Sequence, residues 1–118
     1  MRKDRKHIRL PILSVAFIEL ESPGIGEEGS GKVATCKSLN VSQGGLKVEL
    51  EEEITVGALL QVGVELPNAD EPLYLVGEVR WCRPGEQAEG PWVAGFQLMN
   101  ADNSDILHWR DLVAQLEI

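Results

Sequence analysis

Short runs in which apolar and polar residues alternate occupy most of the chain and predict β-strands. Leu46, Val48 and Leu50 alternate with Lys47 and Glu49, a period of two that is typical of a strand with one buried face. Similar apolar runs, each bounded by turn residues such as glycine and proline, are 12–20, 32–39, 60–66, 73–82 and 92–98. The pattern therefore predicts six strands.

The periodicity changes near the end of the chain. Apolar residues three or four positions apart form one helical face: Ile106, Trp109, Val113 and Leu116. Asn103-Ser104 precedes them as a capping sequence, and Asp105 falls in the first turn, so we expect a helix over 103–117. Six short antiparallel strands usually close into a barrel or a sandwich. The helix either packs on this sheet or provides an oligomer surface.

Size and composition indicate one cytoplasmic domain. The chain has 118 residues, enough for a modest core, and no apolar run approaches the ~18–20 residues that cross a membrane. Pro11, Ser14 and Glu19 interrupt the first apolar run, and no cleavage site follows it, so we expect no signal peptide and no membrane insertion. Cys36 and Cys82 lack metal-ligand spacing, which favours reduced cysteines and no metal site.

The charge is distributed unevenly. The net charge is −8, but residues 2–9 carry five basic side chains against one acidic one, a local +4 that leaves −12 for the rest. Such a body repels long polyanions, which argues against DNA or RNA as a partner. The basic arm either concentrates a small anion or is a solvated tail.

Two familiar kinds of chemistry have little support. Residues 24–29 fit G-x-G-x-x-G and residues 26–32 fit G-x-x-x-x-G-K, but a strand-like run follows them, whereas a phosphate loop needs a helix N-terminus there. The two histidines, His7 and His108, lie in the arm and the predicted helix, so no catalytic triad is indicated. We therefore expect a binding protein rather than an enzyme.

Two short motifs carry complementary binding chemistry. Arg5 and Arg9 form an R-x-x-x-R in the arm, and each guanidinium pairs with two acceptors at once, as on a guanine edge or a phosphate. Asn40, Ser42 and Gly45 form an N-x-S-x-x-G between two strands, where the amide and hydroxyl both donate and accept. Gly45 suits a positive φ or a close ligand approach. Taken separately, each motif is also consistent with a basic tail or a polar turn.

In order and context, the motifs resemble the PilZ domain family over residues 4–115. The matching segments are 4–9, 40–46, 77–81 and 94–98. The resemblance implies a six-stranded antiparallel PilZ-type β-barrel with a C-terminal α-helix. It also implies binding of the bacterial second messenger cyclic di-GMP through the two motifs.

Roles follow from the resemblance residue by residue. Arg5 and Arg9 would contact phosphates and the Hoogsteen edge of guanine, Asn40 and Ser42 would meet a guanine, and Gly45 would keep the turn open. The family accepts Asp or Asn at position 40, and the uncharged Asn would bind less tightly. The second-tier candidates are Lys6, Gly44 and Trp81, and Trp81 is equally consistent with a place in the barrel core.

The expected organisation is a mobile basic arm, residues 1–10, on a barrel domain, residues 11–118. The arm would close over cyclic di-GMP and signal to a downstream protein in biofilm or motility regulation, as a monomer or weak dimer in the bacterial cytoplasm. The competing hypothesis is a PilZ-like adaptor of the motility or pilus type with weak or no nucleotide binding. A barrel for single-stranded nucleic acid is disfavoured by the 5% aromatic content and the acidic body.

Overall fold

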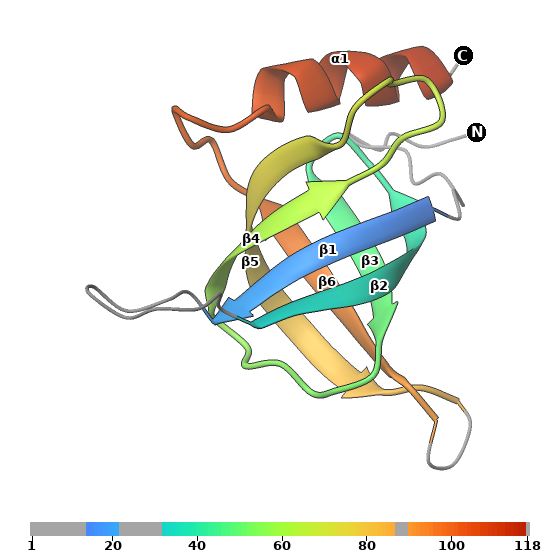
Figure 1. Cartoon of the computed structure of the whole chain (residues 1–118), viewed down its shortest axis with the longest axis vertical. Helices are drawn as coiled ribbons and strands as arrows, with labels where there is room; N and C mark the ends of the chain where they lie inside the picture. Colours follow the sequence, from blue (N-terminus) through green and yellow to red (C-terminus); the bar gives the residue numbers. More distant parts are fainter. Residues whose placement is uncertain (1–13, 22–31, 87–89, 118) are drawn as a thin grey trace, which may run out of the picture.

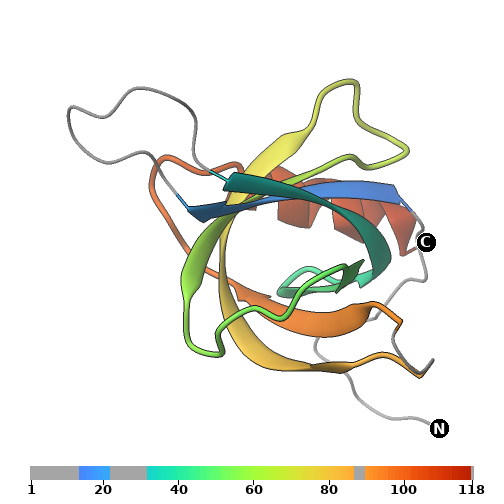
Figure 2. The ribbon, with the colours of Figure 1, turned by 60° about the horizontal axis from the view of Figure 1, so that its bottom comes forward.

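The computed structural model describes residues 14–21, 32–86 and 90–117. In order, the strands are β1 (Ser14–Glu21), β2 (Lys32–Val41), β3 (Gly45–Leu50), β4 (Leu59–Val64), β5 (Leu73–Pro84) and β6 (Trp92–Leu98). They form a closed antiparallel barrel in the order β1-β2-β3-β6-β5-β4, and Figure 2 shows them enclosing one interior. The predicted six-stranded barrel is confirmed, with strand ends within two residues of those expected wherever the ends are described.

Closure comes from β1, which pairs with β2 on one side and with β4 on the other. Where the pairing is regular, alternate residues of a strand then face the interior, as in Ala16 and Ile18 of β1 and Val62 and Val64 of β4, all at most 1% exposed. The intervening residues form the outer surface. The residues that the alternation pattern marks as apolar therefore make a single core.

Within the described residues, the strand pairing shifts register at three places, and the two shifts in β2 and β5 are bulges that change which side chains face outward; the third lies at the end of β1, between Glu19 and Glu21. In β2 the register shifts between Ser38 and Asn40, so that the buried residues are Ser38 and Val41, three positions apart rather than two. In β5 the register shifts between Val79 and Trp81. Strict alternation would direct Asn40 and Trp81 into the core, and the bulges place both on the outer surface.

The single helix of the described ranges, α1 (Ile106–Leu116), lies across one end of the barrel (Figure 1). Its buried residues are Ile106, Trp109, Leu112 and Val113. The prediction that the apolar stripe packs on the barrel is confirmed, although Leu112 takes the deeper place expected of Leu116, which is only partly buried. No helix in these ranges is long and apolar enough to cross a membrane.

The predicted capping of α1 is wrong. The N-cap residue is Asp105, whose side chain makes no capping hydrogen bond; its Oδ2 instead accepts from the Tyr74 N–H at 2.8 Å. The Asp105 N–H donates to the Tyr74 carbonyl, also at 2.8 Å. The Ser104 hydroxyl donates to the Ala101 carbonyl at 2.7 Å. These polar side chains therefore dock the start of α1 on β5 and shape the preceding turn.

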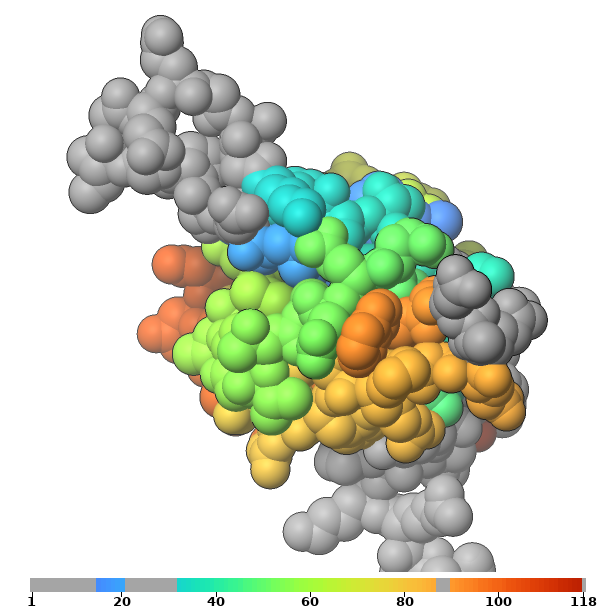
Figure 3. Space-filling view, turned by 90° about the horizontal axis from the view of Figure 1, so that it is seen from below, coloured from blue at the N-terminus to red at the C-terminus, as the bar shows by residue number. Residues whose placement is uncertain are grey.

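The connection between β3 and β4 covers the opposite end of the barrel, shown in green in Figure 3. Ile54 of this connection is buried in the core, and Glu52 forms an ion pair with Lys32 at 2.9 Å. Cys36, on the interior side of β2, is 5% exposed. Burial, and next the charge of Glu52, raise the pKa of its thiol from 9.0 to about 11.

This pKa shift predicts a loss of stability at alkaline pH. Since the folded chain retains the Cys36 proton to higher pH than the unfolded chain, the stabilisation is complete below about pH 9 and is lost as the pH rises toward 11. The full shift corresponds to roughly 2–3 kcal/mol. In urea unfolding across this range, Cys36→Ala should lose stability less steeply than the wild type. Equal slopes in the two proteins would contradict the assignment.

Candidate functional site

A tight hairpin joins β2 to β3 and gathers the second sequence motif. The Ser42 N–H donates to the Gly45 carbonyl at 3.0 Å, and the Gly45 N–H donates back to the Ser42 carbonyl at 3.4 Å. The Gly44 carbonyl accepts from the Leu98 N–H at 2.9 Å, which attaches the hairpin to the end of β6. The structure thus brings Asn40, Ser42 and Gly45 together on a hairpin that backbone hydrogen bonds hold in place.

Asn40 owes its position to the bulge in β2. Its Cα partner on β3 is Lys47, whose side chain lies on the outer surface because its neighbours Leu46 and Val48 are buried. Asn40 is half-buried beside it. An amide that both donates and accepts therefore lies next to a cation on the outer face of the barrel.

Gly45 matters to Ser42 because a side chain at position 45 would lie close to the Ser42 hydroxyl, not because the backbone at Gly45 is strained. Ser42 is 7% exposed, and a Cβ on Gly45 would lie 3.4 Å from the Ser42 Oγ and 3.1 Å from the Phe96 carbonyl oxygen. Gly57 is the one glycine in the described ranges with positive φ, at 94°. Of the two reasons expected for a glycine at position 45, the positive φ is not observed, and the missing side chain keeps room beside the Ser42 hydroxyl.

A row of cross-strand partners runs from the hairpin motif to Trp81. Asn40 pairs with Lys47, Lys47 with Gly95, and Gly95 with Trp81. A Cβ on Gly95 would overlap the indole Nε1 and Cε2 and lie 2.8 Å from Cζ2, so the Trp81 ring lies against the bare backbone of β6. The Arg83 guanidinium carbon is 4.6 Å from the ring centroid, a cation–π contact. Trp81 is therefore a surface ring, not a core residue.

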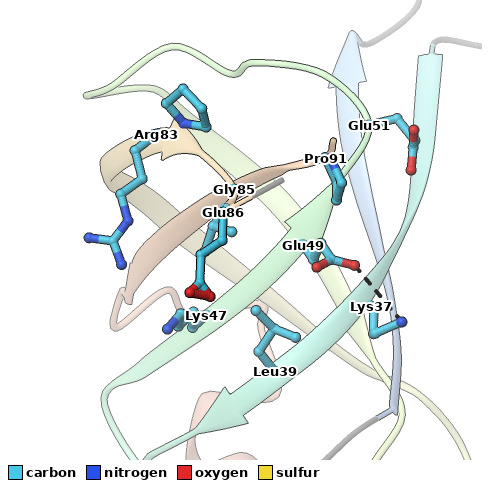
Figure 4. Close-up of a pocket in the computed structure, with 11 residues that line it drawn as sticks. Lys37, Leu39, Lys47, Glu49, Glu51, Arg83, Gly85, Glu86 and Pro91 are labelled. Atoms are coloured by element: carbon cyan, nitrogen blue, oxygen red, sulfur yellow. Dashed lines mark ion pairs between the residues drawn. The ribbon is translucent and has the colours of Figure 1, made fainter. Parts of the chain in front are cut away.

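A groove of about 780 Å³ lies beside this row (Figure 4). Its lining residues come from β2, β3, β5 and β6 and from the connections that follow β3 and β5: Lys37, Leu39, Lys47, Glu49, Glu51, Arg83, Pro84, Gly85, Glu86, Pro91 and Val93. Charges of both signs alternate along it, and the Lys37 ammonium is 3.9 Å from the Glu49 carboxylate. The groove is polar and open, and Lys47 provides a cation at the end nearest Asn40.

Three predicted site residues, Arg5, Arg9 and Lys6, lie outside the described residues. The sequence reasoning missed Lys47 and Gly95 as neighbours of the motif. Lys47 had a usable signal, because it alternates with buried residues on the strand that follows the motif. No group of three or more metal-ligating side chains gathers within 14–21, 32–86 and 90–117.

Comparison with known proteins gives a family and a fold. The family model described as PilZ domain matches residues 3–115. No curated protein matches the chain.

Solved structures share the fold at low identity. The inhibitor of motility MotI/DgrA of Bacillus subtilis has a TM-score of 0.72 and 16% identity, covering 98% of this chain and 52% of its own. YcgR of Escherichia coli in complex with c-di-GMP has a TM-score of 0.64 and 13% identity, covering 96% and 46%. The PilZ domain of YcgR with c-di-GMP has a TM-score of 0.65 and 12% identity, covering 98% and 92%. The chain thus spans about half the length of MotI and of YcgR.

The contact between Gly95 and Trp81 predicts a specific coupling. Gly95→Ala inserts a methyl group where the indole lies and should destabilise the protein by about 1–3 kcal/mol through overpacking. In a Trp81→Ala background the same substitution should cost markedly less, because the overlapping ring is gone. Urea unfolding of the two single variants and the double variant measures this coupling. Additive effects would show that the ring does not lie on Gly95.

Proposed function

The chain belongs to the PilZ domain family, and we propose that it is a receptor for cyclic di-GMP. The observation that carries the proposal is the hairpin geometry: Asn40 and Ser42 lie at one turn, with the side-chain space of Gly45 open beside the Ser42 hydroxyl. The c-di-GMP complexes of YcgR and of its PilZ domain, which share the fold, support the same ligand.

Each side chain of the motifs has a role suited to this ligand. The Asn40 amide and the Ser42 hydroxyl pair with a guanine, whose edges offer both donors and acceptors. Arg5 and Arg9 of the arm pair with phosphate oxygens and with the O6 and N7 of guanine, the acceptor pair that a guanidinium fork fits. In this proposal the barrel holds Asn40 and Ser42 in place, and the arm, residues 1–10, brings Arg5 and Arg9 to the bound ligand.

The outer face next to the hairpin supplies secondary contacts. Lys47, opposite Asn40, contributes positive charge close to a bound phosphate, and Lys6 adds to the same field from the arm. Trp81 offers an apolar ring to the edge of a base. The Gly44 carbonyl is occupied by the Leu98 N–H, so Gly44 contributes through its small size rather than through this oxygen.

The proposed mechanism is a binding switch in which the ligand is not altered chemically. The arm closes over cyclic di-GMP and changes the surface that a downstream protein meets. Ligand binding then alters partner binding only to the extent that the partner has different affinities for the open and the closed arm. A motility protein is the first class of partner to test, because MotI is an inhibitor of motility.

Replacing either motif arginine should weaken binding strongly. Arg5→Ala and Arg9→Ala each remove charge-assisted hydrogen bonds and should cost ~1.5–3 kcal/mol, roughly 10- to 150-fold in Kd. Titration calorimetry with cyclic di-GMP measures the effect, and Arg2→Ala, a charge-matched change outside the motif, should stay within about 3-fold of the wild type. Absence of heat with the wild type at micromolar ligand would sink the receptor proposal and favour the adaptor hypothesis.

Ser42→Ala should have a smaller effect because it removes an uncharged hydroxyl. We expect a loss of ~0.5–1.5 kcal/mol in binding free energy, measured by the same titration. Ser104→Ala, which removes a hydroxyl in the turn before α1, provides the matched control and should leave the Kd unchanged. Equal effects of the two substitutions would argue against a ligand contact by Ser42.

A further inference from the structure

Helix α1 is hydrogen-bonded to the hairpin that carries the N-x-S-x-x-G motif. The indole Nε1 of Trp109 donates to the Ser42 carbonyl at 3.0 Å in a buried contact between residues 67 positions apart. The Gln43 amide donates to the Glu117 Oε1 at 3.2 Å, at the C-terminal end of the helix. Two consecutive residues of the hairpin are therefore held by α1.

The bond from Trp109 is the stronger link. The Ser42 carbonyl also accepts from the Gly45 N–H within the hairpin, but at 3.4 Å, which is longer than the indole bond. Trp109 is 0% exposed, and a hydrogen bond shielded from water is electrostatically stronger. In the second link the Glu117 Oε2 is buried and has no partner among the described residues, which weakens the benefit of that contact. Of the two hydrogen bonds that the Ser42 carbonyl accepts, the one from α1 is thus the stronger, and the orientation of this carbonyl depends on α1 as well as on the hairpin.

We propose that Trp109 is a positioning residue for the ligand site, acting through the Ser42 carbonyl. The inference rests on the proposed function, because Ser42 is there a ligand group. Fixing the carbonyl fixes the backbone from which the Ser42 hydroxyl projects. Because Trp109 is fully buried, its side chain is not available to the ligand, and this hydrogen bond is what links it to a ligand-binding residue.

The same bond couples the ligand site to α1. A ligand that holds Ser42 in its hydrogen-bonded orientation stabilises the docked helix, and a docked helix raises ligand affinity by the same factor. The start of α1 is attached separately to β5 through Asp105. The hairpin is therefore coupled to the position of the middle and the C-terminal end of the helix, where Trp109 and Glu117 make its two hydrogen bonds.

The first experiment uses the ligand-free protein, so that it is independent of the proposed function. Trp109→Phe keeps an aromatic ring but removes the donor, and Trp92→Phe makes the same change at a partly buried tryptophan at the other end of β6, opposite Leu50. Amide hydrogen exchange is measured for the Ser42 and Gly45 N–H groups relative to amides of the β1–β4 ladder. We expect this ratio to rise several-fold in Trp109→Phe and to stay unchanged in Trp92→Phe. A general loss of stability raises both sets of amides equally, and an unchanged ratio in Trp109→Phe would overturn the inference.

The second experiment adds cyclic di-GMP. Trp109→Phe should raise the Kd roughly 3- to 10-fold, against less than about 2-fold for Trp92→Phe. In the wild type, saturating ligand should shift the NMR resonance of the Trp109 indole N–H and leave that of Trp92 in place, which requires no variant to fold. Normal affinity in Trp109→Phe with an unmoved indole resonance overturns the inference while the receptor proposal stands. If the wild type does not bind, the receptor proposal fails and the exchange ratio alone decides the link between α1 and the hairpin.

Discussion

Closure of the sheet is the constraint on which the rest of this structure depends. β1 must pair with both β2 and β4, and once it does, the barrel has no open strand edge and each of its residues faces either in or out. The interior is then filled by apolar side chains such as Ile18 and Val62. Recognition is consequently left to the outer face and to the connections at the ends of the barrel.

The outer face acquires its candidate binding surface from two departures from regular pairing. The bulges in β2 and β5 each add one residue and reverse the inward and outward phase of the next residues, so that Asn40 and Trp81 both face outward. Between them lie Lys47 and Gly95, in one cross-strand row. Since Gly95 has no side chain, the indole of Trp81 lies directly against the backbone of β6, and the row ends in an aromatic ring.

These bulges also mark the limit of what the sequence predicts. Alternation of apolar residues is enough to find the strands, since burying one face is what determines each of them. A bulge gives little signal in the sequence, and no glycine marks the one between Ser38 and Asn40. The outward orientation of Asn40 is therefore seen only from how β2 pairs with β3 in the structure. In the same way, the sequence places Asp105 in the first turn of the helix, but in the structure its carboxylate accepts a hydrogen bond from the Tyr74 N–H instead of capping the helix. The motif residues themselves were predictable because they are adjacent along the chain, whereas the bond from Trp109 to Ser42 joins residues 67 positions apart.

That separation has a consequence for how the protein matures. During synthesis the hairpin leaves the ribosome long before Trp109, with three further strands between them. The two backbone bonds between Ser42 and Gly45 are local and form early, but the indole donor reaches the Ser42 carbonyl only after α1 has emerged and docked on the barrel. The motif is therefore translated early and completed last, so that a nascent or partly folded chain has the residues of the site without its final geometry.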